Sequence, residues 1–265
     1  MTPAAPSLDL ARLEELALSV GREAAEAVRT SHTADHAPVH TKSSRTDIVT
    51  AVDLASEELI RRRLAEGAPG SAVLGEEGGH HRAGDGPHGD IEWVVDPLDG
   101  TVNFAYGIPL TAVSIAAVVD GQAVAGAVLD VTRGEEFTAH RGGGARVDGR
   151  PLAVGDCTDL RLALVVTGYS YDTDRRIAHG RTVAELVGQV RDVRAFGSAA
   201  LQLCWVAAGR VDVYLERDIR PWDHAAGALI ASEAGAAVEL PCPENGDLVV
   251  AANPVLHEAV RPFLT

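Results

Sequence analysis

The sequence predicts a layered α/β fold, and three features of its pattern lead to that prediction. Two amphipathic helices come first, over residues 8–30 and 52–65. Two long apolar stretches, residues 111–119 and 123–131, then flank Asp120-Gly121, which is typical of a β-hairpin with a tight turn. In the second half, strand and helix patterns alternate. An antiparallel sheet followed by βα alternation favours packed layers with a site between the two halves.

The first predicted helix carries apolar side chains at helical spacing between glutamates and arginines. They are Leu10, Leu13, Leu16, Ala17, Val20, Ala24 and Val28. Residues 43–50 are expected to form a loop or a short extended piece, and the second helix ends near Gly67 and Pro69. Residues 72–74 then form a short strand that leads directly into a Gly-Glu-Glu-Gly turn.

Glycines and histidines crowd residues 78–90, and this composition predicts a mobile loop. Residues 91–95 form a strand that ends at Asp96. Beyond the hairpin, residues 134–141 and 145–147 are expected to add to the same sheet, with three consecutive glycines as the turn between them. That turn is not a dinucleotide-binding loop, because no βαβ unit surrounds it.

The second half supplies the remaining elements. Its predicted strands cover residues 162–166, 190–193, 211–215 and 248–251. Its predicted helices cover residues 174–187, 198–208, 222–234 and 254–263. The third of these helices has small residues on most faces, so we expect it to pack closely. Residues 1–265 are interpreted as one unit, with a subdivision into an N-terminal half, 1–150, and a C-terminal half, 151–265.

Composition excludes several classes of function. The chain has 265 residues, is 46% apolar and has a net charge of −15. Such an acidic surface repels phosphate backbones, so nucleic acid is not expected as the main partner. The three cysteines form no CxxC pair and are interpreted as reduced thiols of a cytoplasmic protein. No signal peptide and no membrane-spanning apolar run are visible in the sequence.

The most informative motif lies where the strand ends at Asp96. Pro97 starts a turn that brings Asp99 back beside Asp96, and two carboxylates held that close repel each other unless a cation lies between them. Gly100 and Thr101 then expose backbone N–H groups where a short helix can begin, and these groups can bind a phosphate. The motif therefore indicates a cation and phosphate site.

Other acids occupy similar places at the ends of elements. Glu76 follows a strand and a glycine, Asp53 begins a helix, and Asp223 stands at the head of the small-residue helix. Asp53 and Asp223 can also be simple helix caps. Together with the motif at Asp96, these residues provide the oxygen ligands that Mg²⁺ prefers.

Five segments of the chain resemble the inositol monophosphatase family, in the family's order and spacing. They are residues 47–53, 74–78, 93–104, 197–201 and 221–227. The resemblance covers nearly the whole chain and implies a five-layer αβαβα sandwich, a homodimer, inhibition by lithium and two to three Mg²⁺ ions in each active site. Two modest departures, Val102 and Ser198, stand where the family often has threonine.

The resemblance also assigns metal ligands. Glu76, Asp96 and the backbone carbonyl of Leu98 would hold the first Mg²⁺. Asp96, Asp99 and Asp223 would hold a second, and Glu76 would share a third, looser ion. Two cations a few ångströms apart can hold the attacking and leaving oxygens of a phosphomonoester in line.

The same resemblance implies the catalytic and substrate-binding residues. Thr101, hydrogen-bonded to Asp53, would orient and deprotonate the attacking water, with Glu76 as a further catalytic residue and with no covalent phosphoenzyme. Lys42 would lie near the metals on the family's lysine-containing loop. The residues implied to contact the substrate are Leu98, Asp99, Gly100, Thr101, Gly197, Ser198, Ala199, Glu216 and Asp223.

The expected reaction is the Mg²⁺-dependent hydrolysis of a small sugar or polyol phosphomonoester, with inositol 1-phosphate preferred. Histidinol phosphate, fructose 1,6-bisphosphate and adenosine 3′,5′-bisphosphate are alternative substrates within the superfamily. A metal-binding regulatory protein without turnover is a further alternative. A covalent mechanism of the haloacid-dehalogenase type is disfavoured, because Asp96 and Asp99 stand one residue further apart than in a DxDGT motif.

Two other patterns in the sequence are similar to known kinds of site. Cys204 and Arg210 have the C-x5-R spacing of cysteine phosphatases, but the stretch between them is an apolar helix without the glycine-rich loop of those enzymes. A second pattern, in the 78–90 segment, could bind zinc but lacks the usual ligand spacing. It consists of His80, His81, Asp85 and His88.

Overall fold

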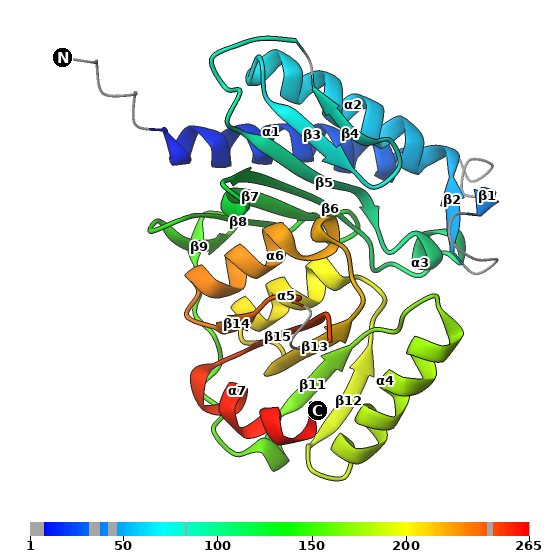
Figure 1. Cartoon of the computed structure of the whole chain (residues 1–265). Coiled ribbons are helices and arrows are strands. Elements are labelled where there is room, and N and C mark those ends of the chain that lie inside the picture. Colours follow the sequence, from blue (N-terminus) through cyan, green and yellow to red (C-terminus); the bar gives the residue numbers. More distant parts are fainter. Residues whose placement is uncertain (1–7, 32–37, 42–46, 83, 243–245, 265) are drawn as a thin grey trace.

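Five layers of helix and sheet stack along the molecule in the computed structural model (Figure 1). The structure describes residues 8–31, 38–41, 47–82, 84–242 and 246–264. Two helices cover one face of the larger sheet, two lie between the sheets, and two cover the far face of the smaller sheet. In that order they are α1 (Leu10–Arg29), α2 (Ala51–Gly67), α5 (Ala199–Ala207), α6 (Pro221–Glu233), α4 (Thr173–Leu186) and α7 (Pro254–Val260). The predicted αβαβα order is confirmed.

The larger sheet has eight strands in the order β10-β9-β8-β7-β6-β5-β3-β4. They are β3 (Ala72–Gly75), β4 (Gly79–Arg82), β5 (Glu92–Asp99), β6 (Ala112–Val119), β7 (Gln122–Asp130), β8 (Glu136–His140), β9 (Gly144–Val147) and β10 (Arg150–Pro151). The predicted hairpin is β6–β7. At its turn Asp120 and Gly121 have φ of 51° and 73°, and the left-handed conformation of both residues matches the twist of the flanking strands.

Two predictions about this sheet were wrong. Residues 79–82 of the expected mobile loop form the edge strand β4, which pairs antiparallel with β3 in the register Val73 to His81. Composition favoured a loop because Gly and His have weak strand preference, and pairing with a buried neighbour overrides that preference. Strand β5 does not end at Asp96 but continues to Asp99, with an irregularity in its pairing with β6 between these two residues.

The smaller sheet has the order β12-β11-β13-β15-β14. Its strands are β11 (Leu164–Thr167), β12 (Asp192–Ala195), β13 (Val213–Arg217), β14 (Ala237–Glu239) and β15 (Leu248–Ala252). The sequence placed β12 two residues too early and missed β14, which is three residues long and only partly buried. The short elements are β1 (Pro38–Thr41), β2 (Ile48–Thr50), α3 (Thr101–Ala105) and the 3₁₀ turns Leu160–Leu162 and Arg261–Phe263.

Three apolar cores fill the space between the layers, and the central core contains residues of α5 and α6. Small residues let these helices approach closely. A Cβ on Gly227 of α6 would lie 2.8 Å from Cβ of Leu203 on α5, and one on Gly126 of β7 would lie 3.2 Å from Cβ of Ala226. The prediction that the 222–234 helix packs closely is confirmed. This packing fixes the position of the first turn of α6, which carries Asp223. Within the described ranges no helix is long and apolar enough to span a membrane.

Candidate active site

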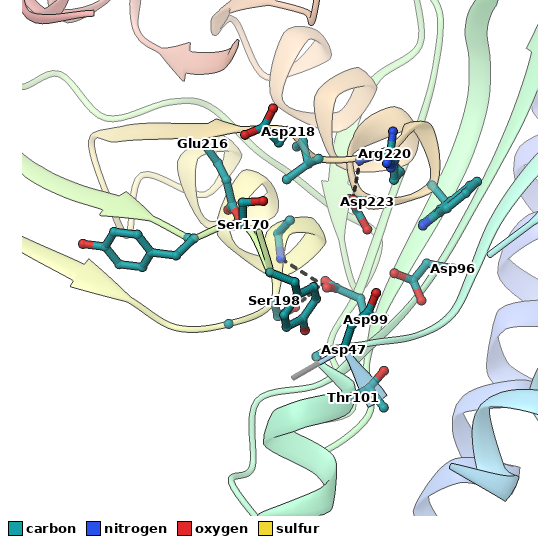
Figure 2. A pocket seen from close by; sticks show the side chains of 18 of the residues that line it. Asp47, Asp96, Asp99, Thr101, Ser170, Ser198, Glu216, Asp218, Arg220 and Asp223 are labelled. Carbon is teal, nitrogen blue, oxygen red and sulfur yellow. Dashed lines mark hydrogen bonds between the residues drawn. The ribbon is translucent and has the colours of Figure 1, made fainter. Parts of the chain in front are cut away.

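A cavity of about 550 Å³ is lined by residues from the ends of both main sheets, and of the predicted site residues that the structure describes, all except Asp53 line it. The predicted residues that line it are Glu76, Asp96, Leu98, Asp99, Gly100, Thr101, Gly197, Ser198, Ala199, Glu216 and Asp223. They come from the carboxyl ends of β3, β5 and β13 and from the first turns of α3, α5 and α6. Figure 2 shows Asp96, Asp99 and Asp223 facing one another across this space. Acids that are far apart in the sequence thus share one cavity.

The end of β5 is shaped by an irregular pairing with β6. Asp96 pairs with Ser114 and Asp99 with Ala112, so two residues of β5 lie opposite one residue of β6. Pro97 fits this position because it has no N–H to leave unpaired. The backbone N–H of Leu98 donates to Asp96 Oδ1 at 3.0 Å. This bulge allows both carboxylates to reach the cavity, whereas regular alternation would separate them.

Gly100 joins the bulge to α3 in a left-handed conformation, with φ of 92°. A Cβ at this position would lie 2.8 Å from the carbonyl oxygen of Leu110 and 3.1 Å from that of Gly197. Only glycine avoids both the strained backbone and the contact with these two oxygens. The sequence Asp-Gly-Thr therefore turns sharply and starts the predicted short helix at Thr101.

Asp53 lies just behind the cavity and holds Thr101. Its Oδ2 accepts from the backbone N–H of Thr50 at 2.9 Å and from the Thr50 hydroxyl, in a capping box at the start of α2. Its Oδ1 lies 2.8 Å from Oγ1 of Thr101, so the hydrogen bond predicted between these residues is present. Both residues are buried. The cap and the Thr101 contact are compatible, because each uses a different carboxylate oxygen.

Asp99 is bound by the first turn of α5. Its carboxylate accepts from the Ser198 hydroxyl at 2.5 Å, from the Ala199 N–H at 3.2 Å and from the Ala200 N–H at 2.9 Å. Helix N-termini favour negative charge because their N–H groups have no partner within the helix. The polar groups of Ser198 and Ala199 therefore bond to Asp99 in this structure. Their predicted contact with substrate stays a prediction.

Asp223 is held by its own helix, α6. Its Oδ2 accepts from the backbone N–H of Arg220 at 2.5 Å, as Figure 2 shows. Burial raises the pKa of Asp223 well above its ordinary value, and the charges of Glu76, Asp99 and Glu216 raise it further. Burial likewise raises the pKa of Asp96 well above its ordinary value, and the charges of Glu76, Asp99 and Asp223 raise it further. Burial raises the pKa of Asp99 to about 6 in spite of its three hydrogen bonds.

The raised pKa values of these acids show that their charges repel one another in the absence of a cation. Eight carboxylates line the cavity against three arginines. The acids are Asp47, Glu76, Asp96, Asp99, Asp172, Glu216, Asp218 and Asp223. Their mutual repulsion would be relieved by hard cations, which prefer carboxylate and carbonyl oxygens. In the described ranges no three His, Cys, Asp or Glu side chains already converge on one point. The chemistry of the donor set, carboxylate and carbonyl oxygens, fits Mg²⁺.

Glu216, near the end of β13, lines another part of the same cavity. One of its oxygens, Oε2, accepts from the Tyr214 hydroxyl at 3.0 Å. A Cβ on Gly168 would lie 2.1 Å from the Glu216 carboxylate, so this glycine makes room for it. Burial raises the pKa of Glu216 to about 8, which makes the protonated form dominant at neutral pH. A carboxyl group in this form can both donate and accept a hydrogen bond.

Sequence reasoning missed several residues that line the cavity. Asp47 stands in a segment that carried the family resemblance but was given no role. Arg175 pairs with Asp218, which has a left-handed φ of 65° at the end of β13. A signal for Asp218 existed, because Asp tolerates this conformation better than most residues. The predicted position of Lys42 near the metals lies outside the described residues.

The zinc alternative in the 78–90 segment finds no support in the described residues. His81 Nε2 lies 2.7 Å from the carbonyl oxygen of Gly78, and His80 pairs with Glu92. Among the residues that the structure describes, no three His, Cys, Asp or Glu groups in this segment could hold a metal ion. Both imidazoles lie on the edge strand β4, where they contact neighbouring residues of the larger sheet.

Cys204 is expected to resist alkylation in the folded protein. It is fully buried in α5, and burial, followed by the charge of Asp99, raises the pKa of its thiol well above the ordinary value. Arg210 pairs with Glu135 instead of facing an anion loop. Iodoacetamide should label Cys204 only after unfolding in guanidinium, as measured by mass spectrometry of the labelled peptides. Rapid labelling of Cys204 in the native protein, with loss of activity, would restore the cysteine-phosphatase interpretation.

Comparison with known proteins gives consistent results. The model of the "Inositol monophosphatase family" matches residues 9–262. "Inositol-1-monophosphatase" of Mycobacterium leprae is 46% identical over 98% of this chain and 95% of that protein. "Nus factor SuhB" of Pseudomonas aeruginosa is 42% identical over 84% of this chain and 83% of that protein. The solved structure "Mycobacterium tuberculosis SuhB" superposes with a TM-score of 0.82 at 43% identity, covering 96% of each chain.

Proposed function

The chain belongs to the inositol monophosphatase family, and on that premise we propose that it hydrolyses inositol 1-phosphate to inositol and phosphate in a Mg²⁺-dependent reaction. It is a phosphatase hydrolase, and metal dependence and lithium sensitivity are typical of its family. The observation that carries the proposal is the hydrogen bond of Thr101 to Asp53 beside four buried or partly buried acids. A protein that only bound metal would still use Asp53 as the cap of α2 but would not need the Thr101 hydroxyl beside it.

The proposed metal ligands are those implied by the family resemblance. Glu76, Asp96 and the Leu98 carbonyl would hold one Mg²⁺, and Asp96 would share a second with Asp99 and Asp223. When bound, the ions neutralise the charge of the phosphate and make water more acidic. Without that charge, the cavity would repel a phosphate dianion, because its acids outnumber its arginines.

Thr101 and Asp53 would carry the proton of the attacking water. The Thr101 hydroxyl donates to Asp53 Oδ1, which leaves lone pairs of Oγ1 free to accept from the water. As the water oxygen bonds to phosphorus, the water proton would pass to Oγ1 of Thr101 while Thr101 passes its own proton toward Asp53. The ester P–O bond would break in the same step, and the inositol oxygen that leaves would take up a proton from solvent water. Thr50 holds Asp53 in place during this transfer, since its backbone and hydroxyl bonds use Oδ2.

The substrate would be a small phosphorylated polyol. A cavity of about 550 Å³ lies within the range of ordinary small-molecule sites. Glu216 reaches it from the side opposite Thr101 and would bond substrate hydroxyls, while the Gly100 and Thr101 amides would bind the phosphate. The 197–199 segment lies between them. We also propose that the protein is a cytoplasmic homodimer. Within each chain, the larger sheet would mark an N-terminal half and the smaller sheet a C-terminal half.

Phosphate release measured on four substrates tests this proposal. Inositol 1-phosphate, histidinol phosphate, fructose 1,6-bisphosphate and adenosine 3′,5′-bisphosphate are compared by kcat/KM with Mg²⁺, with EDTA, and with Mg²⁺ plus lithium. We expect inositol 1-phosphate to have the highest value, no turnover in EDTA and inhibition by lithium. A higher value for another of the four would reassign the substrate. No release from any of them would favour a metal-binding protein without turnover.

The metal-free protein is expected to lose stability as pH rises from about 6.5 to about 8. Burial raises the pKa of Glu216 from 4.5 to about 8 and that of Asp99 from 3.8 to about 6. Between about pH 6.5 and about pH 8 the folded state keeps the Glu216 proton that the unfolded state has lost, so the free energy of unfolding falls as pH rises. Below about pH 6.5, His179 and His224 oppose this trend, because burial lowers the pKa of both from 6.5 to about 4. Melting curves in EDTA measure the effect. Mg²⁺ should raise Tm more at pH 8 than at pH 5, because its ligands must be ionised. A Tm independent of both pH and Mg²⁺ would contradict the prediction.

A further inference from the structure

One face of α2 packs three buried polar side chains against the segments that carry the candidate active site. Asp53, Ser56 and Glu57 have exposed fractions of 1%, 2% and 2%. Their spacing of three and four residues places them on the same side of the helix. Asp53 bonds to Thr101, and the Ser56 hydroxyl donates to the carbonyl oxygen of Pro97 at 2.9 Å. Each thus contacts a segment that carries a proposed catalytic or metal-binding residue. Glu57 has no role so far.

Glu57 holds the turn that carries Glu76. Its Oε2 accepts from the backbone N–H of Glu77 at 2.7 Å, and its Oε1 accepts from that of Gly78 at 2.8 Å. Both carboxylate oxygens are therefore used on two consecutive N–H groups immediately after Glu76. Hydrogen bonds to a charged acceptor are stronger than neutral ones. The carboxylate fixes the backbone direction from which the Glu76 side chain leaves.

The glycines of this turn are shaped around the same carboxylate. A Cβ on Gly75 would lie 2.5 Å from Cδ of Glu57, and a Cβ on Gly78 would lie 2.6 Å from Oε1. Gly78 does not have a positive φ, so its need for glycine comes from this contact. The Gly-Glu-Glu-Gly sequence thus has a packing reason that the strand-and-turn pattern did not reveal.

Arg61 compensates the buried charge. Its Nη1 lies 3.8 Å from Oε1 of Glu57, one helical turn further along α2. Arg61 also lines a second cavity of about 320 Å³ between α2 and the strands β3 and β4, whereas Glu57 lines neither this cavity nor the candidate active site. Glu57 is therefore not placed to touch a metal or substrate, and it can act only through the turn.

We infer that Glu57, charge-compensated by Arg61, is a positioning residue that fixes Glu76 for metal binding. This inference rests on the proposed function, because it takes Glu76 as a metal ligand. Without the Glu57 carboxylate the two N–H groups lose their acceptors and the turn can rotate. Outer residues that orient a metal ligand typically affect metal affinity or activity by about 10- to 100-fold. We expect an effect of that size on the metal, and little effect on substrate affinity once metal is saturating.

The test compares Glu57→Gln with Glu58→Gln, its exposed neighbour on the same helix. Glutamine keeps the shape but can accept only one of the two N–H bonds. Binding of Mn²⁺ without substrate is measured by electron paramagnetic resonance, together with the Mg²⁺ concentration for half-maximal activity, KM at saturating Mg²⁺ and Tm in EDTA. We expect Glu57→Gln to weaken Mn²⁺ binding about 10- to 100-fold and to leave KM within about twofold. Glu58→Gln should match the wild type.

Two further variants keep the inference testable if Glu57→Gln does not fold. Gly78→Ala places a methyl group against Glu57 Oε1 and should weaken Mn²⁺ binding in the same way. Arg61→Gln should give a smaller loss, and Arg62→Gln, which is exposed, should give none. A lower Tm with unchanged Mn²⁺ affinity would overturn the inference and leave only a structural role. If the wild type binds Mn²⁺ but releases no phosphate, the proposed function fails while the effect on metal binding can still be observed.

Discussion

Replacing Asp96 with asparagine is expected to lower kcat/KM for inositol 1-phosphate by about 10³-fold and to stabilise the metal-free protein. Asp96 lies among Glu76, Asp99 and Asp223, and it is the residue proposed to join both ions. Loss of such a contact removes several kcal/mol of transition-state stabilisation, and each 1.36 kcal/mol corresponds to a factor of ten in rate. The asparagine would leave ions bound weakly and in the wrong position.

The stability of the same variant should change in the opposite direction. Because burial and three neighbouring acids raise the pKa of Asp96, its folded-state charge is unfavourable, and that cost grows as pH rises. Asparagine removes it, so Tm in EDTA at pH 8 should rise above that of the wild type. Phosphate release and melting curves measure both effects, with the exposed Asp90→Asn as control. An active variant, or a fall in Tm in EDTA, would show that Asp96 is not a repelled metal ligand.

The parts of the fold that follow from local patterns were predicted well. The β6–β7 hairpin combines two long apolar runs with an Asp-Gly turn, and both signals point to the same structure. β4 and β14 were missed because each is short and only partly buried or exposed. Such edge strands depend on a neighbouring strand for their hydrogen bonds, and that neighbour comes from another part of the chain.

The candidate site was predicted as a set of residues, but its supporting contacts were not. The acids stood out because each ends a strand or begins a helix. Contacts such as Asp99 with Ser198 and Ala200 join residues about 100 positions apart, which no local pattern encodes. Glu57 was overlooked for a related reason. A glutamate on a helix is usually solvated, and only the packed structure shows that this one is buried.

Removal of the Thr101 hydroxyl is expected to lower kcat by about 10²- to 10⁴-fold, which is the usual contribution of a positioned proton-transfer group. Thr101 lies on the first turn of α3, where the backbone of Gly100 fixes it, and its hydroxyl reaches Asp53 behind the cavity. Thr101→Ala leaves the proposed metal carboxylates in place. Metal affinity should therefore stay close to that of the wild type, and the loss should appear in kcat more than in KM.

Thr101→Ser is the matched variant, because it restores the hydroxyl while removing only a methyl group. Its kcat should lie within about tenfold of the wild type, since the serine hydroxyl is less restricted in rotation. Asp53→Asn should resemble Thr101→Ala in kcat, because an amide cannot take up the proton that Thr101 releases. If alanine and serine at position 101 gave the same kcat, the hydroxyl would have no part in the chemistry. The water would then have to lose its proton to another group, and Asp53 would be left as the cap of α2.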